Sequence, residues 1–107
     1  MKKTIRWMEI PIEVELTDSG DTEAWCTTDL ENAKFGLHFK EIHINHIAHE
    51  CWHLFFRVML WMDNVQNFDF FNLGSEIYAW NFGFLVDKVN SALEEMNDKK
   101  RKDKETA

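Results

Sequence analysis

Two histidines and a glutamate within five residues form the part of this sequence best suited to chemistry. The segment is His49-Glu50-Cys51-Trp52-His53, an H-E-x-x-H pattern. On a helix, residues four apart differ by about 40° in azimuth and about 6 Å in rise, so both imidazoles lean to one side. They can bind a single zinc ion, which takes neutral imidazole at about 2.0–2.1 Å. We predict Glu50 as the general base that takes a proton from a metal-activated water.

A catalytic zinc ion normally has three protein ligands and a water, so two histidines do not complete the site. No histidine follows His53, which leaves the downstream carboxylates. We predict Glu76 as the third ligand, in the first turn of a second helix and 23 residues after His53. Ala79 and Gly83 share its helix face, and small residues there would let two helices approach closely. Close packing would also explain Gly83, because a mid-helix glycine costs about 1 kcal/mol relative to alanine.

Four further residues are weaker candidates for the same site. His46 lies seven residues before His53, about 10.5 Å along a helix axis, so it cannot share one ion with it. It could be exposed, or it could hydrogen-bond to a ligand. His43 and His38 could line the cleft and stabilise an oxyanion, with a solvated strand histidine as the alternative for each. Tyr78 could stabilise the transition state or belong to the core.

The N-terminal third has the alternation of β-strands. Apolar and polar residues alternate over residues 10–17, and Pro11 suits a strand start or an edge. Weaker alternation predicts a second strand at residues 23–28, and the alternation of Phe35, Leu37 and Phe39 predicts a third at 35–40, with turn-rich segments between them. We expect a small, mostly antiparallel sheet with one face covered.

Two helices are predicted to follow the sheet. The first covers residues 45–62, with Asn45 as its N-cap, and the second covers residues 75–96, capped by Ser75 or Asn72. A Phe- and Asn-rich connection, residues 63–73, lies between them. The apolar stripe of the first helix is Ile47, Cys51, Leu54, Phe55, Val58 and Met62. The fold class is α+β: a small N-terminal sheet followed by two long antiparallel helices.

Composition and charge narrow the classes of function. The chain has 107 residues, 45% of them hydrophobic, which fits one domain with its own core. We predict that domain over residues 1–96, with a disordered charged tail at 97–107. A net charge of -7 argues against a nucleic-acid partner, and no apolar run is long enough to predict a membrane partner. We expect no secretion signal, a cytoplasmic location, and free thiols at Cys26 and Cys51. Five tryptophans favour a homodimer interface.

Two segments carry a resemblance to a known family. IAHECWH (residues 47–53) and SEIYAWNFGFLVD (residues 75–87) resemble the two motif helices of small phage-encoded zinc metallopeptidases, and more broadly of gluzincins. The likeness spans residues 27–89, about three fifths of the chain. It implies zinc ligands at His49, His53 and Glu76, and a peptide substrate along an edge strand, which would be residues 35–40. Trp80 stands where larger gluzincins often carry an acid that orients a zinc-bound histidine.

The leading hypothesis is therefore a minimal zinc-dependent metallopeptidase acting on a peptide or protein in the host cytoplasm. A second hypothesis is a non-catalytic binding protein in which zinc staples two helices, such as a phage protein that engages a host partner. A third is a metal-free module that dimerises through its aromatic residues.

Overall fold

A sheet and two helices form the part of the chain that this computed structural model describes, residues 1–66 and 76–106. The side chains of residues 63–66, 76–77 and 106 lie outside that description. The order of elements confirms the α+β class. The strands are β1 (Lys2–Trp7), β2 (Ile10–Leu16), β3 (Ala24–Asp29) and β4 (Lys34–Phe39), and the helices are α1 (Ile44–Gln66) and α2 (Glu76–Thr106).

The strand order in the sheet is β1-β2-β4-β3. The hairpins β1–β2 and β3–β4 are antiparallel, whereas β2 and β4 pair in parallel at the centre, so the expectation of a mostly antiparallel sheet is confirmed. The strand predicted at residues 35–40 is an inner strand, and the strand beside it at the edge is β3. Phe35, Leu37 and Phe39 are buried, as an inner strand requires, while β3 is only half-buried.

Strand β1 was not among the predicted strands. Only Ile5 and Trp7 are buried in it, among three basic residues, so its apolar alternation is too short to recognise. Met8 and Glu9 have positive φ values of 51° and 64°, which is the conformation of a two-residue hairpin turn. The indole Nε1 of Trp7 donates a hydrogen bond to the carbonyl of Asn81 at 2.7 Å and so ties β1 to α2.

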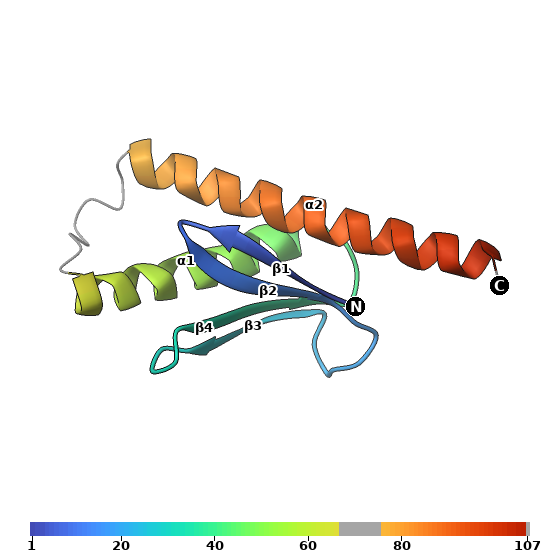
Figure 1. Ribbon diagram of the computed structural model, residues 1–107, viewed down its shortest axis with the longest axis horizontal. Coiled ribbons are helices and arrows are strands. Elements are labelled where there is room, and N and C mark those ends of the chain that lie inside the picture. Colours follow the sequence, from blue (N-terminus) through green and yellow to red (C-terminus); the bar gives the residue numbers. More distant parts are fainter. Residues whose placement is uncertain (67–75, 107) are drawn as a thin grey trace.

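Both helices cover the same face of the sheet and run in opposite directions (Figure 1). Helix α1 packs on β3 and β4, and α2 packs on β1 and β2. One continuous core lies between the two layers and includes Ile12, Val14, Leu37, Leu54, Val58, Leu85 and Leu93, all without exposed surface. Neither α1 nor α2 lies on the other face of the sheet. Within the described residues, neither helix combines the length and apolar character needed to cross a membrane.

Helix α2 continues well beyond its predicted end at residue 96. Residues 97–106, predicted to be a disordered tail, are helical and extend past the sheet (Figure 1). This segment contains no Gly or Pro. Arg101 donates a hydrogen bond to Asp98 at 3.0 Å, one turn away, and Lys100 lies 3.3 Å from the carboxylate of Asp18. The pair of Arg101 with Asp98 and the contact of Lys100 with Asp18 therefore support the helical conformation of residues 97–106.

The predicted close approach of the helices at Ala79 and Gly83 is wrong. Both residues are exposed, and a Cβ atom added at Gly83 would meet nothing within 4 Å. The face of α2 that packs on the core instead includes Leu85, Val89 and Leu93. The apolar stripe of α2 is rotated away from Gly83, so close packing does not explain the glycine.

Gly83→Ala should therefore stabilise the protein. We expect the free energy of unfolding to rise by up to about 1 kcal/mol, because alanine is the better helix former and meets no obstacle here. Gly36→Ala is the control with the opposite expected sign. Its Cβ would lie 2.6 Å from Oγ1 of Thr27, so this substitution should lower the free energy of unfolding. Urea denaturation measures both changes. A destabilised Gly83→Ala variant would contradict the exposed position of this residue.

Candidate metal centre

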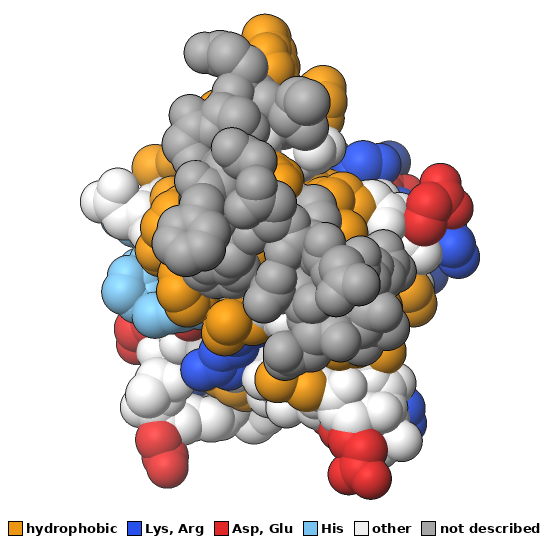
Figure 2. All heavy atoms as spheres, turned by 90° about the vertical axis from the view of Figure 1, so that its left-hand side faces the viewer, with side chains coloured by type: hydrophobic (Ala, Val, Ile, Leu, Met, Phe, Trp, Pro, Cys, Tyr) orange, Lys and Arg blue, Asp and Glu red, His pale blue; other side chains and the backbone are white. Residues whose placement is uncertain are grey.

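The H-E-x-x-H segment lies within α1, as its sequence predicts. No Gly or Pro interrupts residues 44–66, and Ile47, Cys51 and Leu54 have no exposed surface. This buried stripe holds the helix on the sheet and leaves His49 and His53 exposed on its other side. Their Nε2 atoms lie 3.1 Å apart, and the two rings are nearly perpendicular, at 79°. Histidine side chains are visible together at the surface in Figure 2.

Glu50 is more deeply buried than the two histidines. Its side chain belongs to the buried set, with 6% of the residue exposed. One carboxylate oxygen and one nitrogen of each imidazole all lie within 4.8 Å of one another. His49, Glu50 and His53 are the one group of three or more His, Cys, Asp and Glu residues in the described part of the chain that could hold a metal ion. Three potential ligand atoms therefore converge at the surface of α1.

The edge strand β3 is fastened to α1 beside this group. Arg57, one turn after His53, donates a hydrogen bond from Nη1 to Oγ1 of Thr28 at 3.1 Å. Burial raises the pKa of the Cys26 thiol to about 11, against a lowering by Arg57 and a further rise from Glu50. Burial likewise raises the pKa of Cys51 to about 12. Both residues are free cysteines, and at neutral pH they are uncharged thiols packed between α1 and β3.

The imidazole pair fits a zinc ion. An ion about 2.05 Å from each nitrogen, with a tetrahedral angle between the bonds, separates the nitrogens by about 3.3 Å. The observed separation is 3.1 Å, so the rings need almost no movement. A catalytic zinc site takes three protein ligands, and the two histidines would be two of them. A neutral imidazole prefers zinc and similar divalent ions over calcium or magnesium, which take oxygen ligands.

The predicted third ligand, Glu76, is the first residue of α2, and its side chain lies outside the described residues. Ala79 and Gly83 are one and two turns further along the same helix face, and both are exposed. The argument that small residues bring this face against α1 therefore no longer supports Glu76. Its role as a ligand stays a prediction from the resemblance alone.

His43 and His46 lie at the start of α1, away from the ligand group. His43 precedes the first helical residue, and its Nδ1 accepts a hydrogen bond from the backbone N–H of Asn45 at 3.2 Å. His43 is thus the N-cap, and the prediction of Asn45 for that position is wrong. His46 is half-buried against the ring of His43, with 4.8 Å between the ring centroids, and its Nδ1 is buried without a hydrogen-bond partner.

Tyr78 and His38 are also placed by the structure. Tyr78 is buried and belongs to the hydrophobic core, in agreement with the alternative considered for it. His38 is buried as well, so the interpretation as a solvated strand histidine is wrong. It lies in β4 on the face of the sheet opposite the helices, where it joins Glu15 and Thr27. Neither of these two residues was singled out in the sequence, because pairing across three strands brings them to His38.

No protein-family model matches the chain, and no curated protein or solved structure is significantly similar to it. The relation to phage zinc metallopeptidases and gluzincins therefore stays a prediction carried by the residues themselves.

Zinc binding should depend on His49 and His53. We expect His49→Ala and His53→Ala each to weaken zinc binding by at least tenfold, because each removes one of two converging nitrogens. His46→Ala is the matched control on the same helix and should bind zinc as the wild type does. Isothermal titration with zinc at neutral pH measures all three. Equal affinity in His46→Ala and His53→Ala would contradict the assignment.

The cap of α1 gives an independent prediction. His43→Ala should lower the free energy of unfolding by about 0.5–2 kcal/mol, since it removes the acceptor for the N–H of Asn45. His43→Asn should restore most of the loss, and Asn45→Ala should have little effect. Urea denaturation of the three variants tests this order, and a larger loss in Asn45→Ala would reverse the assignment of the cap.

Proposed function

We propose that this protein is a zinc-dependent peptidase whose metal is held by His49 and His53 and whose general base is Glu50. The observation that carries the proposal is the 3.1 Å separation of the two Nε2 atoms together with a carboxylate oxygen within 4.8 Å. Helical spacing explains why the nitrogens converge, and the burial of α1 explains why they face solvent. Glu76 remains the proposed third ligand from the resemblance.

A bound zinc ion would lower the pKa of a water molecule and polarise the carbonyl of the scissile bond. The chain's own residues bind the ion and transfer the proton. His49 and His53 present one nitrogen each and need little rearrangement. Glu50 takes a proton from the attacking water and returns it to the leaving amine. Its burial next to Cys51 limits the directions in which its carboxylate can turn.

The proposed substrate is an extended peptide beside β3. The resemblance implies an edge strand next to the motif helix, and in this sheet that strand is β3 rather than β4. No strand of the described residues pairs with its outer side, so its backbone groups can pair with an added segment. The hydrogen bond from Arg57 to Thr28 keeps this strand next to the helix that carries the histidines.

The alternative of a zinc-stapled binding protein receives less support from this arrangement. A staple must join two elements, and because His49, Glu50 and His53 all belong to α1, a staple would rest on Glu76 alone for its contact with α2. Both histidines are exposed, which suits an open coordination position better than a closed structural site. The binding-protein hypothesis becomes better supported than the peptidase if zinc strongly raises the free energy of unfolding while no peptide is cleaved.

Glu50→Gln separates metal binding from catalysis. We expect this variant to bind zinc with wild-type affinity and to cleave peptides at least about 10²-fold more slowly, because the amide cannot take the proton. Glu41→Gln, an exposed acid just before α1, should change neither property. The measurement is cleavage of a mixed peptide library by mass spectrometry, with zinc titration in parallel.

Two results would count against the peptidase. If wild-type protein loaded with zinc leaves the library intact, the peptidase proposal fails and the zinc-stapled binding protein becomes the better explanation. If Glu50→Gln cleaves as fast as the wild type, Glu50 is not the base. Glu76→Gln tests the third ligand, since a true ligand should lower zinc affinity as much as His53→Ala does.

A further inference from the structure

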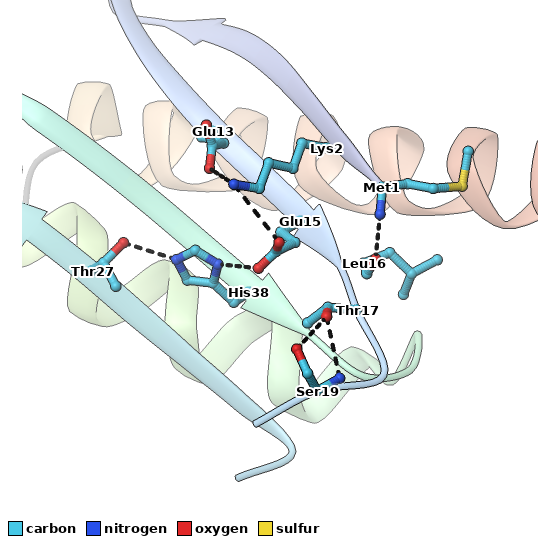
Figure 3. A network of polar contacts seen from close by, with 9 residues as sticks. All are labelled: Met1, Lys2, Glu13, Glu15, Leu16, Thr17, Ser19, Thr27 and His38. Carbon is cyan, nitrogen blue, oxygen red and sulfur yellow. Dashed lines mark hydrogen bonds and ion pairs between the residues drawn. The ribbon is translucent and has the colours of Figure 1, made fainter. Parts of the chain in front are cut away.

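A second group of polar residues lies on the face of the sheet opposite α1 and α2. Glu15 in β2, His38 in β4 and Thr27 in β3 stand side by side on three adjacent strands (Figure 3). Oε1 of Glu15 is 2.8 Å from Nδ1 of His38, and Oγ1 of Thr27 is 2.8 Å from Nε2 of the same ring. The result is a line of carboxylate, imidazole and hydroxyl.

The chemistry of Glu15 and Thr27 determines which ring nitrogen of His38 carries the proton. An ionised carboxylate can only accept, so Nδ1 of His38 donates to Glu15. In the neutral ring Nε2 is then an acceptor, and the hydroxyl of Thr27 donates to it. This is the tautomer and the direction that a general base needs to take a proton from a hydroxyl nucleophile. Lys2 lies 3.9 Å from the other carboxylate oxygen of Glu15 and 3.4 Å from Glu13.

The imidazole is held firmly in place. His38 is 9% exposed, and the indole of Trp25 stacks on it with 5.0 Å between ring centroids and 12° between planes. Trp25 in turn lies against Gly20, where an added Cβ would be 2.7 Å from the indole ring. Such packing fixes the rotamer of His38 and keeps bulk water from most of the ring.

The hydroxyl end of the line is the accessible end. Thr27 is exposed, and it lines a shallow groove of about 370 Å³ together with Gly36, Pro11, Glu13, Ala33 and Lys34. A Cβ at position 36 would lie 2.6 Å from Oγ1 of Thr27 and 3.1 Å from Nε2 of His38. Glycine at this position therefore leaves space directly over the bond between hydroxyl and imidazole.

We propose that Thr27, His38 and Glu15 form a second, metal-independent site that hydrolyses small esters through an acyl-threonine. Oγ1 of Thr27 bonds to the carbonyl carbon of the ester while His38 takes the hydroxyl proton. The bond from that carbon to the alcohol oxygen breaks, and His38 gives the proton to the departing alcohol. Water then attacks the acyl group by the same route, which releases the acid and restores the threonine. Thr27 and His38 are the catalytic residues, and Glu15 is a positioning residue.

The groove indicates the class of substrate. Pro11 and Ala33 offer an apolar wall for a short acyl chain. Lys34 lies on β4 two residues before Gly36, on the same face, and its ammonium is the candidate group for stabilising negative charge on the carbonyl oxygen. The shallow shape favours a small, uncharged ester over an extended polymer. This site is on the opposite face of the sheet from the helix that carries His49 and His53, so it does not depend on the proposed metal centre.

The test uses full-length protein with p-nitrophenyl acetate and p-nitrophenyl butyrate in the presence of a chelator. We expect release of p-nitrophenol above the rate of an equal concentration of free imidazole, with an acyl group mapped to Thr27 by mass spectrometry. Thr27→Val, which keeps the shape and removes the hydroxyl, should abolish both signals, and Thr27→Ser should retain them. Thr22→Val, which removes an exposed hydroxyl that does not line the groove, should change neither.

Glu15→Gln tests the positioning role. We expect a fall in kcat of about 10²- to 10⁴-fold with little change in KM, because the amide no longer stabilises a protonated imidazole. Ester hydrolysis by Thr27→Val at the wild-type rate, acylation at another residue, or no hydrolysis above the imidazole background would each overturn the proposal. A purely structural network would show lower stability in Thr27→Val without any loss of ester hydrolysis.

Discussion

The burial of one side of α1 against β3 and β4 determines the geometry of the candidate metal centre. Because Ile47, Cys51 and Leu54 have no exposed surface, the helix can adopt only one rotation about its axis. That rotation leaves His49 and His53 exposed and buries Glu50 next to them. The ligands need no dedicated loop, because hydrophobic packing already orients them. A change in core packing would therefore move the site without altering any residue in it.

Much of this arrangement follows from periodicity in the sequence. The alternation over residues 10–17 and the apolar stripe of α1 are long patterns with many independent positions, so both elements appear where they were predicted. Strand β1 has only two buried apolar residues, so its alternation is too short to predict a strand. The convergence of His49 and His53 depends only on local helical geometry, which is why it could be predicted without knowledge of the fold.

Several of the wrong predictions involve relations between distant elements. Gly83 was assigned to a contact between helices, but local sequence does not reveal which face of α2 meets the core when apolar residues occur on several sides. The edge strand was assigned to residues 35–40, but strand order depends on how two hairpins join. The N-cap of α1 is His43 rather than Asn45, because the ring nitrogen of a histidine can accept a hydrogen bond from a backbone N–H of the first helical turn. The network of Glu15, Thr27 and His38 likewise exists only through pairing across three strands.

The parallel pairing of β2 with β4 also has a consequence for how the chain folds. Hairpins β1–β2 and β3–β4 each join neighbours in the sequence and can form within microseconds. Joining β2 to β4 closes a longer loop, so it carries the larger entropic cost and belongs to a later stage of folding. The network of Glu15, His38 and Thr27 therefore forms only when the two hairpins join, whereas the convergence of His49 and His53 requires α1 alone.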